Sequence, residues 1–296
     1  MIGAKENFNN TWPFNPNFFS GNGFKQHYVD EGKENNKVIL CLHGEPTWGY
    51  IYRHFIKELS KNFRVVVPDL MGFGKSETPK NKEYSLKTHV ENLENLVNYL
   101  ELKNIYFVGQ DWGGPILGAY TLRNLTNTKG MFLINTIFGY SRTEKPKELT
   151  PWFKWIKKNE ENGTLDGVLG ELNTTVLSIM KLLNFTNSSI IDDNWIKAYA
   201  SPFPNRDSCL GAINFPLDVL HGRMVPFIID CLKNGDMKSF LDIPSKQATI
   251  CLQSRPPGDS AIVPGISDGS NPSTSRVIKN FPASGKLPKN HSIPFS

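Results

Sequence analysis

An aspartate inside a glycine-rich hexapeptide is the first candidate for chemistry in this chain. Residues 109–114 read Gly-Gln-Asp-Trp-Gly-Gly and directly follow an apolar run, Ile105 to Val108. A nucleophile on a sharp strand-to-helix turn needs small flanking residues, because its backbone is strained and the strand and helix approach closely. A carboxylate is already ionised at neutral pH, so Asp111 needs no base before it attacks. The pattern predicts a carboxylate nucleophile.

The identity of this nucleophile limits the reaction. A carboxylate that attacks a saturated carbon forms an alkyl-enzyme ester, which a histidine-activated water can then hydrolyse. Halides and strained epoxides are suitable leaving groups. The alternative interpretation of Asp111 is a helix cap in an ordinary glycine-rich turn.

A second motif lies about seventy residues upstream, where an apolar run ends at Leu42 and is followed by His43-Gly44-Glu45-Pro46. Hydrolases with such a nucleophile turn use this position to supply one backbone N–H of an oxyanion hole. The N–H groups of Glu45 and Trp112 are therefore the two predicted donors. A turn with a buried histidine is the alternative.

The elements that must position these motifs alternate along the first half of the chain. Short apolar runs at 37–42, 63–67, 104–108 and 130–134 are typical of strands buried on both faces. Between them, Ser85 to Leu100 has apolar residues at three- and four-residue spacing, which predicts a helix capped by Ser85. This alternation predicts a mostly parallel sheet with helices on both faces and ligands at the carboxyl ends of the strands.

The alternation stops near residue 139, where the sequence becomes helical and amphipathic; beyond residue 255 it is rich in Pro, Gly, Ser and Asn. Such a tail has too little apolar surface to offset its ordering entropy, so we expect loop or disorder there. The predicted division is a first core part at 1–138, a helical cap at 139–210, a second core part at 211–254 and an atypical tail at 255–296.

Composition excludes several classes of protein. The formal net charge of +5 comes from scattered lysines without a basic block, which argues against nucleic-acid binding. No apolar run approaches the length of a membrane span, and the first ten residues lack the features of a secretory signal, so we expect a cytoplasmic protein. Four separated cysteines and no His at metal-ligand spacing predict buried thiols and no metal.

Four segments then resemble one family in order and spacing. The chain is similar to haloalkane dehalogenases of the subgroup with Glu after His-Gly in the segments HGEPTWGYIYR, PDLMGFGKSETP, GQDWGG and AYASPFP. The resemblance covers about residues 12 to 230. It implies an α/β-hydrolase fold with an inserted helical cap, and Asp111 as the nucleophile. The indole N–H groups of Trp112 and a cap tryptophan would hold the halide, with Trp155 as the expected partner and Trp152 as the alternative.

The resemblance also requires an acid and then a histidine after the nucleophile. His291 and Asp259 have the expected order, and 32 residues (291 − 259) separate them. Their surroundings differ from the family pattern: Gly258-Asp259 replaces a Gly-x-x-Asp turn and Asn290-His291 replaces a Gly-His pair. If His291 does not reach Asp111, the enzyme would be alkylated once and would not turn over.

The resulting hypothesis is a haloalkane dehalogenase, a hydrolase that converts a small halogenated aliphatic substrate and water into an alcohol and a halide without a cofactor. Epoxide hydrolase is one alternative, although the cap region offers only Tyr140 and Tyr199 as proton donors to an opening oxygen. A catalytically impaired protein of the same fold is the other. The preferred halide, the substrate length and the oligomeric state are not predicted.

Overall fold

A computed structural model describes residues 2–136, 149–183, 188–236 and 248–251. Within this part of the chain, seven strands form one sheet in the order β1-β2-β4-β3-β5-β6-β7. The strands are β1 (Asn17–Phe19), β2 (Gln26–Glu31), β3 (Val38–Leu42), β4 (Arg64–Pro68), β5 (Ile105–Gln110), β6 (Thr128–Ile134) and β7 (Ala248–Cys251).

The five strands from β3 to β7 confirm the predicted parallel sheet. β3 pairs in parallel with β4 and β5, and the parallel pairing continues through β6 to β7. All five residues of β3 are buried, as expected for a strand covered on both faces. β1 and β2 were not predicted; they add two antiparallel strands at one edge. β2 has the polar composition of a loop, because it contains Gln26, His27 and Asp30, although all three are buried.

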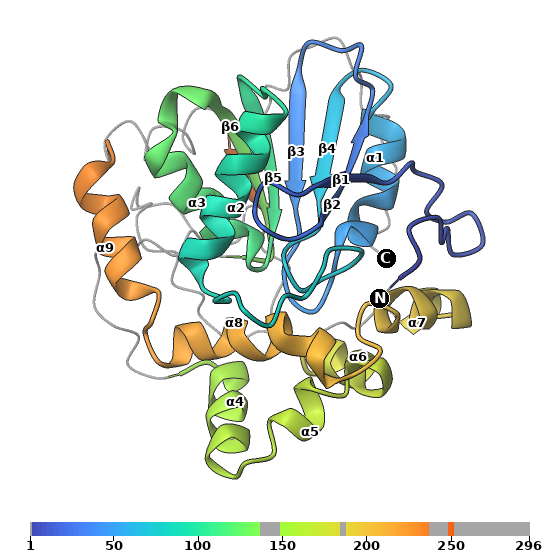
Figure 1. Cartoon of the computed structure of the whole chain (residues 1–296), viewed down its shortest axis with the longest axis vertical. Helices are drawn as coiled ribbons and strands as arrows, with labels where there is room; N and C mark the ends of the chain where they lie inside the picture. The colour runs from blue at the N-terminus through green and yellow to red at the C-terminus, as the bar shows by residue number, and fades with distance from the viewer. Residues whose placement is uncertain (1, 137–148, 184–187, 237–247, 252–296) are drawn as a thin grey trace, which may run out of the picture.

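Helices cover the sheet on both sides, as predicted (Figure 1). α2 (Leu86–Tyr99) begins after Ser85, whose side chain accepts a hydrogen bond from the Thr88 N–H and so confirms the predicted cap. It packs against α3 (Gly113–Arg123), which also contacts α9 (Val225–Asn234). α1 (Arg53–Leu59) follows η1 (Gly49–Tyr52) and packs against β4. The short η2 (Leu125–Asn127) leads from α3 into β6.

The described residues between β6 and α9 are mostly helical. This helical region, the insertion, continues past residue 210, where the predicted cap ends, and the predicted cap bounds of 139–210 stay a prediction. Figure 1 shows α4 to α8 gathered together beyond one end of the sheet. Its elements are α4 (Pro151–Glu161), α5 (Asp166–Leu169), α6 (Leu172–Leu182), η3 (Ser188–Ile190), α7 (Asp193–Ala200), η4 (Arg206–Cys209) and α8 (Leu210–Leu220). The predicted tail at 255–296 lies outside the described residues.

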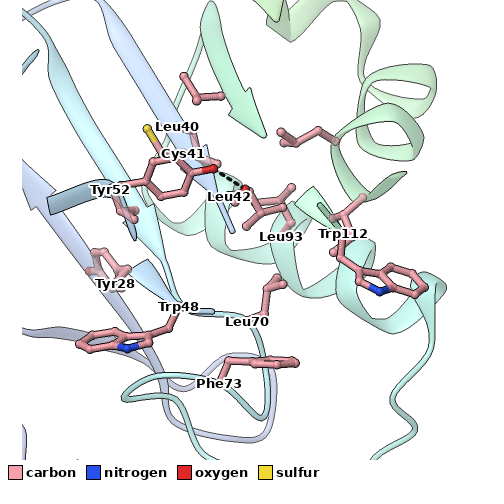
Figure 2. Close-up of a cluster of buried hydrophobic side chains, with 14 of the residues drawn as sticks. Tyr28, Leu40, Cys41, Leu42, Trp48, Tyr52, Leu70, Phe73, Leu93 and Trp112 are labelled. Atoms are coloured by element: carbon pink, nitrogen blue, oxygen red, sulfur yellow. Dashed lines mark hydrogen bonds between the residues drawn. The ribbon is translucent and has the colours of Figure 1, made fainter. Parts of the chain in front are cut away.

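The core extends from the sheet to the insertion without interruption. Leu40, Leu42 and Trp112 belong to the same buried cluster as residues of α6, α7 and α8. Figure 2 shows its central part, where the Tyr52 hydroxyl donates to the Leu42 carbonyl at 2.8 Å. Cys41, Cys209 and Cys231 are free and buried, as predicted. In the described part of the chain, no helix combines the length and apolarity needed to cross a bilayer.

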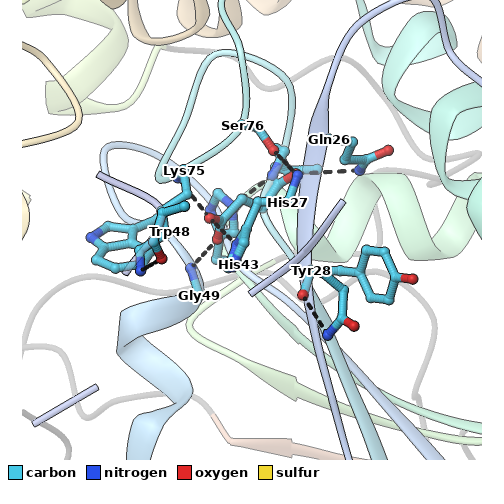
Figure 3. A network of polar contacts seen from close by, with 12 residues as sticks. Gln26, His27, Tyr28, His43, Trp48, Gly49, Lys75 and Ser76 are labelled. Carbon is cyan, nitrogen blue, oxygen red and sulfur yellow. Dashed lines mark hydrogen bonds and ion pairs between the residues drawn. The ribbon is translucent and has the colours of Figure 1, made fainter. Parts of the chain in front are cut away.

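A polar network next to β4 holds several loops together (Figure 3). The Asp69 carboxylate is fully buried and lies 2.8 Å from His27 Nδ1. It also accepts hydrogen bonds from the backbone N–H groups of Gly49 and Lys75, both at 2.8 Å. The Lys75 ammonium donates to the carbonyls of Ala4 and Glu6. Asp69 therefore connects β2, the start of η1, the loop after β4 and, through Lys75, the N-terminal residues.

Replacement of Asp69 with Asn should lower the free energy of unfolding by about 3 kcal/mol or more at neutral pH, because the amide turns an N–H₂ group toward buried donors. Burial alone would raise the pKa of Asp69, but His27, His43 and the Lys75 N–H hold it below its usual value. The contribution of Asp69 is thus present above the unfolded-state pKa and is lost as the pH falls. Urea unfolding of wild type and Asp69→Asn should show a difference that shrinks under acid conditions.

Asp207→Asn is the matched control, because Asp207 pairs with Lys80 on the exposed surface. It should cost less than about 1 kcal/mol. An equally small effect at Asp69 would contradict the role given to the network.

Candidate active site

Asp111 lies at a sharp turn between β5 and α3. Its φ of 51° is in the left-handed region, which non-glycine residues rarely adopt. A Cβ on Gly113 would lie 2.2 Å from the Leu42 carbonyl oxygen, so only glycine fits where α3 passes the end of β3. The strained turn and its small flanking residue are the geometry expected from residues 109–114.

The sheet register brings the second motif to the same place. Leu42, the last residue of β3, pairs with Gly109 of β5. The two segments that follow these strands therefore leave the sheet side by side. The Glu45 N–H donates to Asp111 Oδ1 at 2.8 Å, and the Trp112 N–H also hydrogen-bonds to this carboxylate. Two backbone donors therefore converge on one carboxyl group, as an oxyanion hole requires.

Space at this junction is minimal. A Cβ on Gly44 would lie 2.3 Å from Asp111 Oδ1 and 2.5 Å from the Trp112 nitrogen. Position 44 thus needs a residue without a side chain, because the backbone touches the carboxylate. The close approach explains the glycine of the His-Gly motif.

Burial controls the charge of the two acids. It raises the pKa of Asp111 to about 6, although the N–H groups of Glu45 and Trp112 oppose the rise. Burial and the negative charge of Asp111 raise the pKa of Glu45 well above its usual value. Glu45 Oε1 is buried and has no hydrogen-bond partner among the residues that the structure describes. Burial and the mutual repulsion of the two acids therefore favour a protonated Glu45 beside an ionised Asp111.

The Trp112 indole forms part of the core beneath the insertion. It is buried and stacks on Phe215 of α8, with ring centroids 4.2 Å apart. Phe73 stacks on Phe215 at 5.3 Å. Helix α8 thus holds the indole beside Asp111 through aromatic contact.

Trp155 and Trp152 lie on α4, half buried and stacked on each other at 5.4 Å. Helix α4 packs against α8, which carries Phe215. Helix α8 therefore contacts both the helix that carries Trp155 and the ring of Trp112. The described ring contacts pair Trp155 with Trp152, so its halide-binding role stays a prediction.

Two further expected residues, Asp259 and His291, lie outside the described residues, as does Tyr140. In the described part of the chain, no group of three His, Cys, Asp or Glu side chains is arranged to hold a metal ion.

Sequence reasoning missed Thr136, whose hydroxyl donates to the Asp111 carbonyl. Thr136 follows the end of β6, the neighbour of β5 in the sheet. Its signal was its place at the carboxyl end of an adjacent parallel strand, where ligand-binding residues are expected.

Comparisons with known proteins identify the fold that carries these residues. A family model described as alpha/beta hydrolase fold matches residues 37–167. A haloalkane dehalogenase from Paraglaciecola agarilytica, reported as tetrameric, has 29% identity and a TM-score of 0.62 over 81% of this chain and 77% of its own. The fold is thus an α/β-hydrolase fold.

Two curated relatives extend the comparison. Haloalkane dehalogenase 2 from Mycobacterium bovis is 39% identical over 127 residues, which is 43% of this chain and only 44% of that protein. A cis-3-alkyl-4-alkyloxetan-2-one decarboxylase from Shewanella oneidensis is 30% identical over 70% of this chain and 63% of its own length. The chain spans less than two thirds of both relatives.

The raised pKa of Asp111 predicts a pH-dependent cost in stability. A buried acid binds its proton more tightly in the folded state, so the stabilising contribution is present at low pH and is lost as the pH rises through about 6. Asp111→Asn should therefore be more stable than wild type at pH 8 by about 1–3 kcal/mol, with the difference vanishing near pH 4. Urea unfolding of both proteins between pH 4 and pH 8 measures this difference in the free energy of unfolding. A difference independent of pH would contradict the assigned pKa.

Proposed function

Because the chain has the α/β-hydrolase fold and is related to haloalkane dehalogenases, we propose that it cleaves carbon–halogen bonds by hydrolysis. The observation that carries the proposal is the Asp111 carboxylate at φ 51°, held by the Glu45 N–H at 2.8 Å. A carboxylate at this turn attacks carbon directly, whereas a serine in the same place needs a base.

In the first step, one Asp111 oxygen attacks the carbon that bears the halogen. The new C–O bond forms as the carbon–halogen bond breaks, and the halide leaves with the bonding electrons. The indole N–H groups of Trp112 and Trp155 would hold this anion, since an indole donates and does not compete as an acceptor. The apolar ring stack around Trp112 suits a small aliphatic substrate.

In the second step, water attacks the ester carbonyl carbon with His291 as its base and Asp259 as the residue that orients His291. The backbone N–H groups of Glu45 and Trp112, already directed at the carboxylate, would stabilise the oxyanion. The ester then breaks to release the alcohol and restore Asp111, and a proton is left over. No step requires a cofactor.

A second candidate is supported by the Shewanella relative, which matches a larger share of this chain than the mycobacterial dehalogenase does. Asp111 could attack the saturated ring carbon of an oxetan-2-one that is bonded to the ring oxygen. The bond between this carbon and the ring oxygen breaks, and a carboxylate is freed. Loss of CO₂ from that carboxylate would form a C=C bond and expel Asp111. This route needs neither water nor a histidine.

Epoxide hydrolysis has weaker support in the described residues. It needs an acid to protonate the epoxide oxygen as the ring opens, and the Tyr199 hydroxyl already hydrogen-bonds with the Arg53 side chain. The Tyr199 ring is buried and contacts the rings of Tyr50 and Trp195. Its position favours a structural role.

The main test combines intact-mass measurement with product analysis. Wild type incubated with 1,2-dibromoethane should release bromide and show a transient adduct, whereas Asp111→Ala should do neither. His291→Ala should retain the adduct, because its ester lacks the water-activating base.

Other outcomes identify the alternatives. A persistent adduct in both wild type and His291→Ala indicates a catalytically impaired protein. Diol from styrene oxide without bromide from dibromoethane indicates an epoxide hydrolase. Alkene and CO₂ from a cis-3,4-dialkyloxetan-2-one, without bromide release, indicate the decarboxylation.

The cap partner of Trp112 can be tested separately through halide binding. Trp155→Phe should weaken bromide binding, followed by quenching of tryptophan fluorescence, about tenfold or more through loss of one hydrogen bond to an anion. Trp152→Phe is the matched control, because both rings lie in the same stack on α4. Weakened binding in Trp152→Phe alone would assign the role to Trp152.

A further inference from the structure

The two ends of one peptide group have different tasks in the candidate site. The Glu45 N–H points at Asp111 Oδ1, and the carbonyl of the same peptide unit belongs to Gly44. In a trans peptide the N–H and C=O point in opposite directions within one plane. Whatever holds the Gly44 carbonyl therefore also directs the Glu45 N–H.

Three donors hold that carbonyl. The Thr47 N–H and the Thr47 hydroxyl both donate to the Gly44 oxygen at 3.0 Å. The third is the imidazole of His43, whose Nδ1 lies 2.9 Å from this oxygen. Both side chains are buried, so water does not compete for these hydrogen bonds.

The tautomer of His43 follows from its other nitrogen. The Leu70 N–H can only donate, and it lies 2.9 Å from His43 Nε2, so Nε2 is the acceptor. Burial lowers the pKa of His43, although Asp69 and the Gly44 carbonyl oppose this change. The neutral ring thus carries its proton on Nδ1 and donates it to Gly44.

We propose that His43 and Thr47 are positioning residues that clamp the Gly44–Glu45 peptide, so that its N–H is fixed on the Asp111 carboxylate. The inference rests on the proposed function only in taking Asp111 as the reactive group. The two residues do not touch the substrate; they act through the Glu45 N–H. A peptide free to rotate would turn this donor away from the carboxylate and from the oxyanion that follows.

The clamp predicts an effect on the charge of Asp111. The Glu45 N–H stabilises the ionised carboxylate, so a weaker clamp should raise the pKa of Asp111 above its value of about 6. Among the described residues, the charged or titratable side chains near this system are Glu45 and Tyr52 beside Asp111, and Asp69 and His89 beside His43. They remain in every variant below, so a change reports the clamp itself.

Matched variants separate the clamp from general packing. Thr47→Val removes the hydroxyl donor and keeps the shape, whereas Thr47→Ser keeps the hydroxyl. His43→Gln reproduces an acceptor at the place of Nε2 and lacks the Nδ1 donor. His43→Asn places an N–H₂ group near Nδ1 and retains the donor.

The experiment is a ¹³C NMR titration of carboxyl-labelled aspartate in the full chain, with the Asp111 signal assigned from Asp111→Asn. The pKa of Asp111 should rise by about one unit in His43→Gln and by about half a unit in Thr47→Val. It should stay near the wild-type value in Thr47→Ser and change less in His43→Asn than in His43→Gln. Adduct formation with 1,2-dibromoethane should slow about tenfold in His43→Gln, measured at a pH where Asp111 is ionised.

The titration needs no turnover, so it separates this proposal from the proposed function. A wild type that forms no adduct contradicts the carbon–halogen chemistry, while the pKa pattern still tests the clamp. The clamp proposal is overturned if the pKa of Asp111 in folded His43→Gln and Thr47→Val equals the wild-type value. If His43→Gln does not fold, the Thr47→Val and Thr47→Ser pair decides.

Discussion

A negative charge held partly out of water is the constraint around which this molecule is organised. Asp111 leaves β5 in a left-handed conformation, and burial raises its pKa. Such a carboxylate is tolerable only with donors close to it. The donors are backbone N–H groups from two loops, so among the described residues no positively charged side chain is needed to hold this carboxylate.

These donors are in place because β3 and β5 are neighbours in the sheet. Their parallel pairing brings Leu42 opposite Gly109, and the two loops then leave the sheet at the same level. Glycines at 44 and 113 allow contact at distances that any side chain would prevent. The rigid sheet therefore sets the position of the site, and the polar groups around His43 and Asp69 set the conformation of the loops.

The insertion is joined to the site by apolar contact. Phe215 of α8 stacks on both Trp112 and Phe73, so the indole next to Asp111 is packed by a residue from the helical region. On another side, the Trp48 indole donates to the Ala198 carbonyl of α7 at 2.9 Å. Trp48 lies three residues after Glu45, so the loop that supplies a donor to Asp111 also contacts the insertion.

The sequence by itself determined the local features. Glycine spacing, the apolar runs and the Ser85 cap predicted the turn at Asp111, the four parallel strands β3 to β6 and α2, because these depend on neighbouring residues. Only the tertiary structure decided which polar groups meet. β2 carries buried Gln26 and Asp30 that read as loop residues, and the contacts of His43, Thr47 and Thr136 depend on strand order and packing. Hydrogen bonds between segments have no period in the sequence, so the spacing of apolar residues did not reveal these contacts.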